Sequence, residues 1–227
     1  MHQALAVDFF SINKIFFTAL GYPMSYLEFF GVMFGLIAVA LSAKANIWSW
    51  PIGVINVVLA FFFYYQIQLY PDMVLQIFFC ITNLIGWWRW AHPQPEEEDK
   101  KKELKVSYMK LNQFTAIALI GLAGTFLFGY LASNLHEWFP VLFSLPSSFP
   151  YADSFILVMS IVTTFLMIQK KIECWILWII IDLVATVLYF VKGAKFYSVE
   201  YFVLTVLAAW GLWHWIKEFR SYRIHAH

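Results

Sequence analysis

The chain contains 227 residues, of which 62% are hydrophobic and 13% charged, and its net charge is +1. Soluble domains are typically about 45–50% apolar and about 25% charged, so this composition excludes a soluble globular domain and a disordered chain, and the small net charge gives no basis for nucleic-acid binding. The remaining class is a polytopic membrane protein with spans of about 20 residues. Its apolar runs are continuous, which argues against a membrane barrel.

The first half of the chain begins with an amino-terminal segment, residues 1–24, in which apolar residues between Phe9 and Leu20 are mixed with polar ones. This mixture predicts an amphipathic helix lying in the membrane interface. Three apolar spans then make up a first repeat over residues 25–91, and their expected bounds are 25–43, 48–67 and 72–90.

The second half begins with a charged linker, residues 92–111, which contains the run PQPEEEDKKKELK and is expected to be a solvated loop. A linking span and an external loop follow, at 112–134 and 135–153. A second repeat over 154–216 has its spans at 154–169, 173–191 and 199–216, and a basic tail, 217–227, ends the chain.

Basic residues give the predicted orientation. With the amino terminus outside and the carboxyl terminus inside, 12 of the 15 lysines and arginines fall on the inner side. Because inner loops of membrane proteins are enriched in Lys and Arg, we expect a multi-pass protein with an external amino terminus and a cytoplasmic carboxyl terminus.

A weak internal repeat predicts the fold class. The segment Gly86–Trp90 (GWWRW) resembles Gly211–Trp215 (GLWHW) at an offset of 125 residues, whereas pairing Trp48 with Trp175 and Asn56 with Asp182 gives 127 and 126, which requires a small indel. We therefore predict an all-α membrane protein with seven transmembrane helices, arranged as two parallel three-helix repeats joined by a linking helix. Tryptophan belts at the membrane interface are an alternative source of the similarity.

Polar and aromatic residues inside the spans are candidate site residues, because polar side chains in a bilayer usually face the protein interior. They are Trp175, Trp178, Asp182 and Tyr189 on one face of the sixth span, Trp48, Trp50 and Asn56 on the second, and Gln76, Thr82 and Asn83 on the third. The alternatives are a belt role for the tryptophans and interhelical hydrogen bonds for the amides. Cys80 and Cys174 lie in apolar segments without the partners of a zinc site, and no metal or cofactor is expected.

The residue types among these side chains indicate the chemistry of the ligand. Facing tryptophans and a tyrosine suit a flat, cationic ring, Asp182 complements a positive charge, and amides satisfy a carboxamide or ribose hydroxyls. A phosphate does not fit, because the middle of the spans lacks Lys and Arg.

The chain resembles PnuC, the bacterial nicotinamide riboside transporter family, over roughly residues 25–216. The resemblance rests on NIWSWPIGVIN (46–56), Gln76 with Thr82-Asn83, GWWRW (86–90) and ECWILW (173–178). It implies a SWEET-like homotrimer in the cell inner membrane that takes up a dephosphorylated vitamin B3 precursor for NAD biosynthesis. We predict facilitated diffusion by alternating access, because nothing in the spans resembles a sodium site. The resemblance implies trapping by a soluble kinase that acts downstream without required contact.

Two alternatives to nicotinamide riboside transport stay open. Relatives that resemble PnuC carry thiamine or riboflavin, so the resemblance alone does not fix the substrate. A membrane-embedded enzyme or structural subunit is the other class, but no embedded catalytic motif is visible, and we expect no enzymatic activity.

Overall fold

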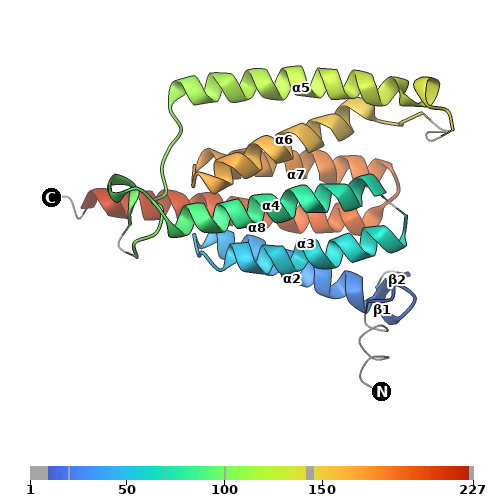
Figure 1. Ribbon diagram of the computed structural model, residues 1–227, viewed down its shortest axis with the longest axis horizontal. Helices are drawn as coiled ribbons and strands as arrows, with labels where there is room; N and C mark the ends of the chain where they lie inside the picture. Colours follow the sequence, from blue (N-terminus) through green and yellow to red (C-terminus); the bar gives the residue numbers. More distant parts are fainter. Residues whose placement is uncertain (1–9, 20, 69, 100, 142–145, 225–227) are drawn as a thin grey trace. The chain divides into compact units, whose positions relative to one another are not determined.

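The computed structural model describes residues 10–19, 21–68, 70–99, 101–141 and 146–224. Seven long helices account for most of them (Figure 1): α2 (Tyr26–Ala43), α3 (Ser49–Gln66), α4 (Tyr70–Ala91), α5 (Leu111–Trp138), α6 (Pro150–Ile168), α7 (Glu173–Val191) and α8 (Lys195–Ile224). Six of these, all except α4, are long and apolar enough to cross a membrane by length and composition. The prediction of an all-α membrane protein is confirmed: all seven predicted transmembrane segments form helices, and six of them meet this criterion.

The chain divides into two compact units. Unit 1 contains residues up to Val106 together with those from Trp213 onward, and unit 2 contains Ser107–Leu212. In unit 1, α3 packs against both α2 and α4, and in unit 2, α6 packs against both α5 and α7. Helix α8 contributes its first part to unit 2 and its last part to unit 1.

Local signals explain where several helices begin and end. Helix α2 starts after Ser25, whose hydroxyl accepts a hydrogen bond from the backbone N–H of Glu28 at 3.2 Å, as an N-cap residue does. Helix α6 starts at Pro150, earlier than expected, because proline is favoured in the first helical turn. Helix α8 continues to Ile224, so most of the predicted basic tail is helical.

The amino-terminal segment forms a hairpin where a helix was expected. Strand β1 (Ile15–Ala19) pairs antiparallel with β2 (Tyr22–Ser25), and Gly21 between them has a φ of 82°. Aromatic and β-branched residues favour strands, and the left-handed turn requires a residue such as glycine, so the helix prediction is wrong for this part of the segment. Residues 1–9 and 20 lie outside the described residues, and the interfacial location stays a prediction.

The hairpin is attached to α2 by a hydrogen bond. The hydroxyl of Tyr22 donates to Glu28 Oε1 at 2.9 Å. Burial, together with the hydrogen bond and the negative charge of Glu28, raises the pKa of Tyr22 to about 12. The tyrosine therefore stays protonated, and able to donate, throughout the physiological pH range.

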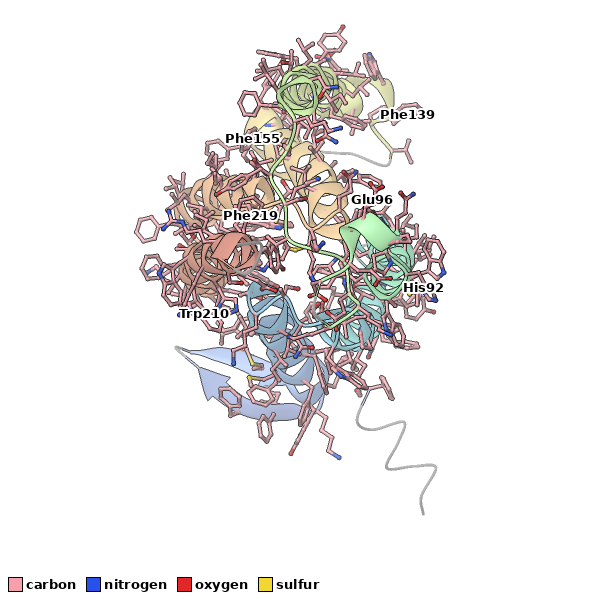
Figure 2. All side chains as sticks on the ribbon, turned by 90° about the vertical axis from the view of Figure 1, so that its left-hand side faces the viewer. His92, Glu96, Phe139, Phe155, Trp210 and Phe219 are labelled. Atoms are coloured by element: carbon pink, nitrogen blue, oxygen red, sulfur yellow. The ribbon has the colours of Figure 1, made fainter. Side chains whose placement is uncertain are left out.

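Most described residues of the charged linker are exposed or half-buried, and the linker also contains short elements of structure. It contains a short 3₁₀ helix, η1 (Pro95–Glu97), and Figure 2 marks His92 before it and Glu96 within it. Arg89 at the end of α4 forms an ion pair with Glu97 at 2.6 Å. Leu104, near the end of the charged run, and Val106, just after it, are only 3% and 1% exposed. The backbone N–H of Leu104 donates to the carbonyl of Trp90 at 3.1 Å, which brings this part of the linker back onto α4.

The connections within the two repeats have the same backbone conformation at a uniform offset. Ala45, between α2 and α3, has a φ of 51°, and Lys170, between α6 and α7, has a φ of 53°. After α3 and α7, Gln68 and Gly193 have φ values of 62° and 79°. Each pair is separated by 125 residues, so helices α3 and α7 correspond without any insertion or deletion.

The uniform offset corrects the alignment made from the sequence. Trp175 corresponds to Trp50 and not to Trp48, and the expected indel between the repeats is wrong. The backbone N–H of Trp50 donates to the carbonyl three residues earlier at 3.2 Å, and that of Trp175 does the same at 3.1 Å. Each tryptophan therefore occupies the first turn of its helix.

Candidate functional site

Trp50 is the largest predicted site residue in the interface between α3 and α4. Its side chain is 6% exposed and lies over Gly86, where an added Cβ would overlap the indole ring. It also meets Trp90 edge to face, with ring centroids 5.2 Å apart. Among the described residues no hydrogen-bond acceptor reaches its buried Nε1, so the indole keeps a donor available.

Asn83 lies in the same interface, one turn before Gly86 on α4. Its Nδ2 donates to the carbonyl of Phe79 on its own helix at 2.8 Å. Its Oδ1 is the nearest atom to the place that a Cβ on Gly53 would occupy. No described residue donates a hydrogen bond to this oxygen, so an acceptor remains available beside Trp50.

Of the other predicted residues of unit 1, two form hydrogen bonds to helix backbone, one is half-buried and one is exposed. Asn56 donates to the carbonyl of Gly31 on α2 at 2.8 Å, and the hydroxyl of Thr82 donates to Phe79 at 3.0 Å on its own helix. The first bond fits the interhelical role that was the alternative for the amides, and the second is local to α4. Gln76 is half-buried, while Trp48 at the start of α3 is 64% exposed and does not join the buried group.

The predicted face of α7 is largely buried in unit 2. Trp175 is 1% exposed and covers Gly211 of α8, where an added Cβ would come within 2.7 Å of the indole. Trp178, one turn further along α7, is half-buried. The spacing of these residues in the sequence correctly identified one side of the helix.

Asp182 is a buried carboxylate on this face. It is 4% exposed, and among the described residues no hydrogen bond or ion pair reaches its carboxylate. At the uniform offset it corresponds to Val57 of the first repeat, not to Asn56, so the charge has no polar counterpart there. Burying a carboxylate without a partner is unfavourable, so Asp182 is a candidate contact for a cationic or hydrogen-bonding group of a ligand.

The carboxyl-terminal part of α7 is held by polar and aromatic contacts. Tyr189 stacks on Tyr201 of α8, with ring centroids 5.3 Å apart and planes at 6°. The hydroxyl of Ser198 donates to the carbonyl of Thr186 at 2.8 Å, and the hydroxyl of Thr186 donates to that of Asp182 at 2.7 Å. Tyr201 and Ser198 were missed in the sequence, although their spacing places both on one face of α8.

An ion pair ties the same end of α7 to the start of α6. The ammonium of Lys192 lies 2.6 Å and 2.9 Å from the two carboxylate oxygens of Asp153. It also lies 5.7 Å from the ring centroid of Tyr189. The Tyr189 ring is therefore positioned by a stacked tyrosine and a nearby cation.

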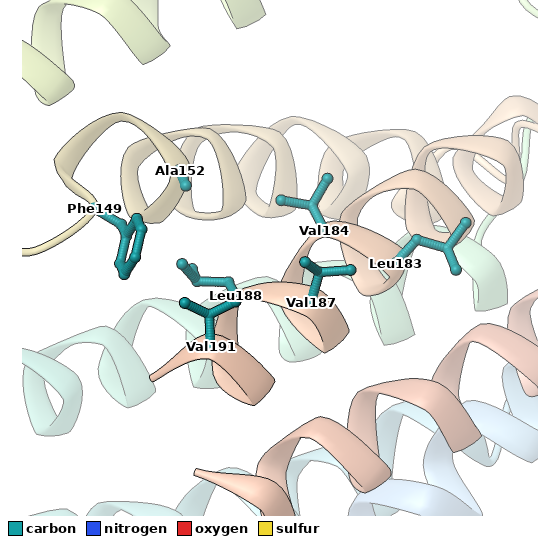
Figure 3. A pocket seen from close by; sticks show the side chains of 7 residues that line it. All are labelled: Phe149, Ala152, Leu183, Val184, Val187, Leu188 and Val191. Carbon is teal, nitrogen blue, oxygen red and sulfur yellow. The ribbon is translucent and has the colours of Figure 1, made fainter. Parts of the chain in front are cut away.

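A groove of about 470 Å³ lies between the start of α6 and α7 (Figure 3). Its lining is entirely apolar and contains none of the predicted site residues: Phe149, Ala152, Leu183, Val184, Val187, Leu188 and Val191. A polar nucleoside would find no hydrogen-bonding side chain there, so this groove is not the candidate site.

Comparisons with known proteins give consistent results. The family model described as nicotinamide mononucleotide transporter matches residues 25–217. The nicotinamide riboside transporter PnuC of Escherichia coli is 33% identical over 236 residues, which cover 95% of this chain and 97% of that protein. The riboflavin/roseoflavin transporter RibM of Streptomyces davaonensis is 24% identical over 205 residues, with 90% and 91% covered.

A solved structure has the same fold. The crystal structure of the vitamin B3 transporter PnuC aligns with a TM-score of 0.65 at 23% sequence identity, covering 86% of this chain and 83% of that one. At this level of identity the likeness concerns the fold.

Proposed function

This chain belongs to the nicotinamide mononucleotide transporter family, the PnuC family, and we propose that it carries nicotinamide riboside across the cell inner membrane. Membership makes it a membrane transporter and not an enzyme. We take the proposed substrate from the name of the 33% identical relative. The chemistry of nicotinamide riboside then has to match the side chains of this chain.

The observation that carries the proposal is the buried carboxylate of Asp182 on the tryptophan-bearing face of α7. Nicotinamide riboside has a flat, positively charged pyridinium ring, and an indole face attracts such a ring, by about 2 kcal/mol or more when water is excluded. A carboxylate 4% exposed and without a partner among the described residues gains a counter-charge when the cation binds. One face of α7 therefore complements both features of the substrate: Trp178 the flat ring, and Asp182 its positive charge.

The remaining predicted residues are proposed to complete the site. Trp175 and Tyr189 extend the aromatic face of α7. In unit 1, Trp50 offers an N–H donor and Asn83 a carbonyl acceptor, which suit a carboxamide or ribose hydroxyls. Lesser contributions are proposed for the other four residues, Gln76, Thr82, Asn56 and Trp48.

Transport is proposed to be facilitated diffusion by alternating access, in which the repeats move about a central site. Phosphorylation by a soluble kinase, which needs no contact with the carrier, would then trap the substrate inside. We further propose a homotrimer with the amino terminus outside and the carboxyl terminus in the cytoplasm. The orientation is supported by the excess of basic residues on the inner side.

A phosphorylated substrate is disfavoured by the distribution of positive charge. The basic residues within the described helices lie at their ends, as do Arg89 in the last turn of α4 and Lys195 at the start of α8. Arg89 is also paired with Glu97. Helix α7 itself contains no Lys or Arg, so a nucleotide phosphate beside Asp182 would meet a carboxylate and no cation of that helix.

Riboflavin is the second candidate substrate, because the transporter RibM is similar to this chain over 90% of its length. Riboflavin is a flat ring with a polyhydroxyl chain and would use the same aromatic face, but it carries no positive charge for Asp182. Thiamine, which is cationic, is the third. The charge of the ring therefore distinguishes riboflavin from the two cationic candidates, nicotinamide riboside and thiamine.

Calorimetry with the detergent-purified chain tests which of the candidate substrates it binds most tightly. We expect nicotinamide riboside to bind more tightly than thiamine or riboflavin, and nicotinamide mononucleotide not to bind measurably. Liposomes that contain only this chain should equilibrate labelled nicotinamide riboside without concentrating it. Tighter binding of another vitamin would replace the proposed substrate, and accumulation above equilibrium under a proton gradient would contradict facilitated diffusion.

A further inference from the structure

Gly53 of α3 has no side chain at the point where Asn83 of α4 meets it. A Cβ added there would overlap Oδ1 of Asn83 and would lie 3.1 Å from its Cγ. The amide is also fixed at its other end, because Nδ2 donates to the carbonyl of Phe79 at 2.8 Å. For a larger residue at position 53 the Asn83 side chain would have to shift, which would disturb that hydrogen bond.

The equivalent positions of the second repeat carry the opposite combination. At the uniform offset of 125 residues, Gly53 corresponds to Trp178 and Asn83 corresponds to Ala208, which is 2% exposed. The first repeat therefore has the small residue on its middle helix and the larger one on its third helix, whereas the second repeat reverses them. The two larger residues, Asn83 and Trp178, are the ones proposed to contact the substrate.

We propose, on the basis of the proposed function, that Gly53 is a positioning residue that sets substrate specificity through Asn83. The missing side chain allows the Asn83 amide to hold an orientation in which Oδ1 accepts no hydrogen bond from the described residues. This acceptor takes a neutral donor of the substrate, either a ribose hydroxyl or a carboxamide N–H. Gly53 itself touches the amide and not the substrate.

The test compares four variants with the wild-type chain: Gly53→Ala, Asn83→Ala, the double variant, and Gly31→Ala as a matched control. An added Cβ at Gly31 in α2 would meet Leu59 at 3.8 Å, an ordinary contact. Each protein is purified in detergent, its thermal unfolding is recorded, and its affinity is measured by calorimetry for whichever of nicotinamide riboside, thiamine and riboflavin the wild-type chain binds. A substrate other than nicotinamide riboside would revise the proposed function without removing this test.

Gly53→Ala and Asn83→Ala should each weaken binding at least about tenfold, and the double variant should bind no more weakly than Asn83→Ala, because residues that act through one contact are not additive. The double variant should also unfold at a higher temperature than Gly53→Ala, since the overlap is gone. Gly31→Ala should bind like the wild type.

Three results would overturn the inference. They are wild-type affinity in folded Gly53→Ala, wild-type affinity in Asn83→Ala, and additive losses in the double variant. If Gly53→Ala does not fold, the comparison of the double variant with Asn83→Ala still decides between non-additive and additive effects. If the wild-type chain binds none of the three vitamins, the proposed site and this inference fall together.

Discussion

Trp175 of α7 lies with its indole ring over Gly211 of α8, so close that an added Cβ would stand 2.7 Å from the ring atoms. Both residues are buried. The same relationship joins Trp50 to Gly86 in the first repeat, at the uniform offset of 125 residues. Each repeat thus uses one tryptophan and one glycine to bring its second and third helices together.

Gly211→Ala should destabilise the protein, although alanine has the higher helix propensity by about 0.5–1 kcal/mol. Overpacking of a buried contact costs about 1–3 kcal/mol, and the overlap with Trp175 leaves little room for relaxation. Thermal unfolding in detergent, followed by tryptophan fluorescence, should show a lower midpoint for Gly211→Ala than for the control Gly31→Ala. Equal midpoints for the two variants would mean that the indole moves away easily.

Trp178→Ala should weaken binding of nicotinamide riboside at least about tenfold, since stacking on an aromatic ring contributes about 1–3 kcal/mol per contact and 1.4 kcal/mol corresponds to a factor of about ten. The matched control is Trp213→Ala. Trp213 is 58% exposed and has Lys217 5.3 Å from its ring centroid, so its loss should lower the folded yield more than the affinity. The reverse ordering in calorimetry would show that the face of α7 serves packing alone.

Asp182→Asn removes the carboxylate charge and keeps the shape of the side chain, although one acceptor oxygen becomes an NH2 donor. The affinity for a cationic ring should fall at least about tenfold, whereas the affinity for neutral riboflavin should be unchanged if the wild-type chain binds it. Calorimetry with the two ligands measures the difference. A parallel loss for both would indicate that the carboxylate acts through the fold, and a variant that binds both normally would remove Asp182 from the site.

The predicted orientation can be tested with two introduced cysteines. Ser147, in the loop before α6, and Lys101, in the charged linker, are both exposed. In intact cells a membrane-impermeant maleimide should label Ser147→Cys, and it should label Lys101→Cys only after permeabilisation. The wild-type chain, which retains Cys80 and Cys174, gives the background. Labelling in the opposite order would invert the topology.

The helices could be predicted from the sequence because charged residues and prolines flank their apolar runs. Helix α7 has the predicted bounds, since Glu173 and Lys192 flank its apolar run. Helix α5 extends four residues beyond the predicted end at Asn134 because that side chain and Ser133 donate to carbonyls of their own helix, at 2.7 Å and 2.8 Å. Such returning hydrogen bonds allow polar residues to continue a helix, and their pattern is not visible in hydropathy.

Which residues share one face of a helix could be predicted from the sequence, whereas contacts between helices could not. The spacing of Trp175, Trp178 and Asp182 placed them on one face, as periodicity can. The opposition of Gly53 and Asn83 depends on how two helices are aligned along their axes, which a single sequence does not specify. The alignment of the repeats was wrong for a related reason, because residue types alone do not reveal the turn conformations that fix the offset.

The left-handed turns at Ala45 and Gln68, and their equivalents at Lys170 and Gly193, limit the insertions that this chain can accept during evolution. Between each pair of turns the residue count is identical, and each residue rotates a helix by about 100°. A single inserted residue within α3 or α7 would move every later side chain to a different face of that helix, because the turns fix both helix ends. Substitutions can therefore retune the carrier for a new vitamin, but insertions within these two helices should be tolerated far less than insertions in the loop before α6.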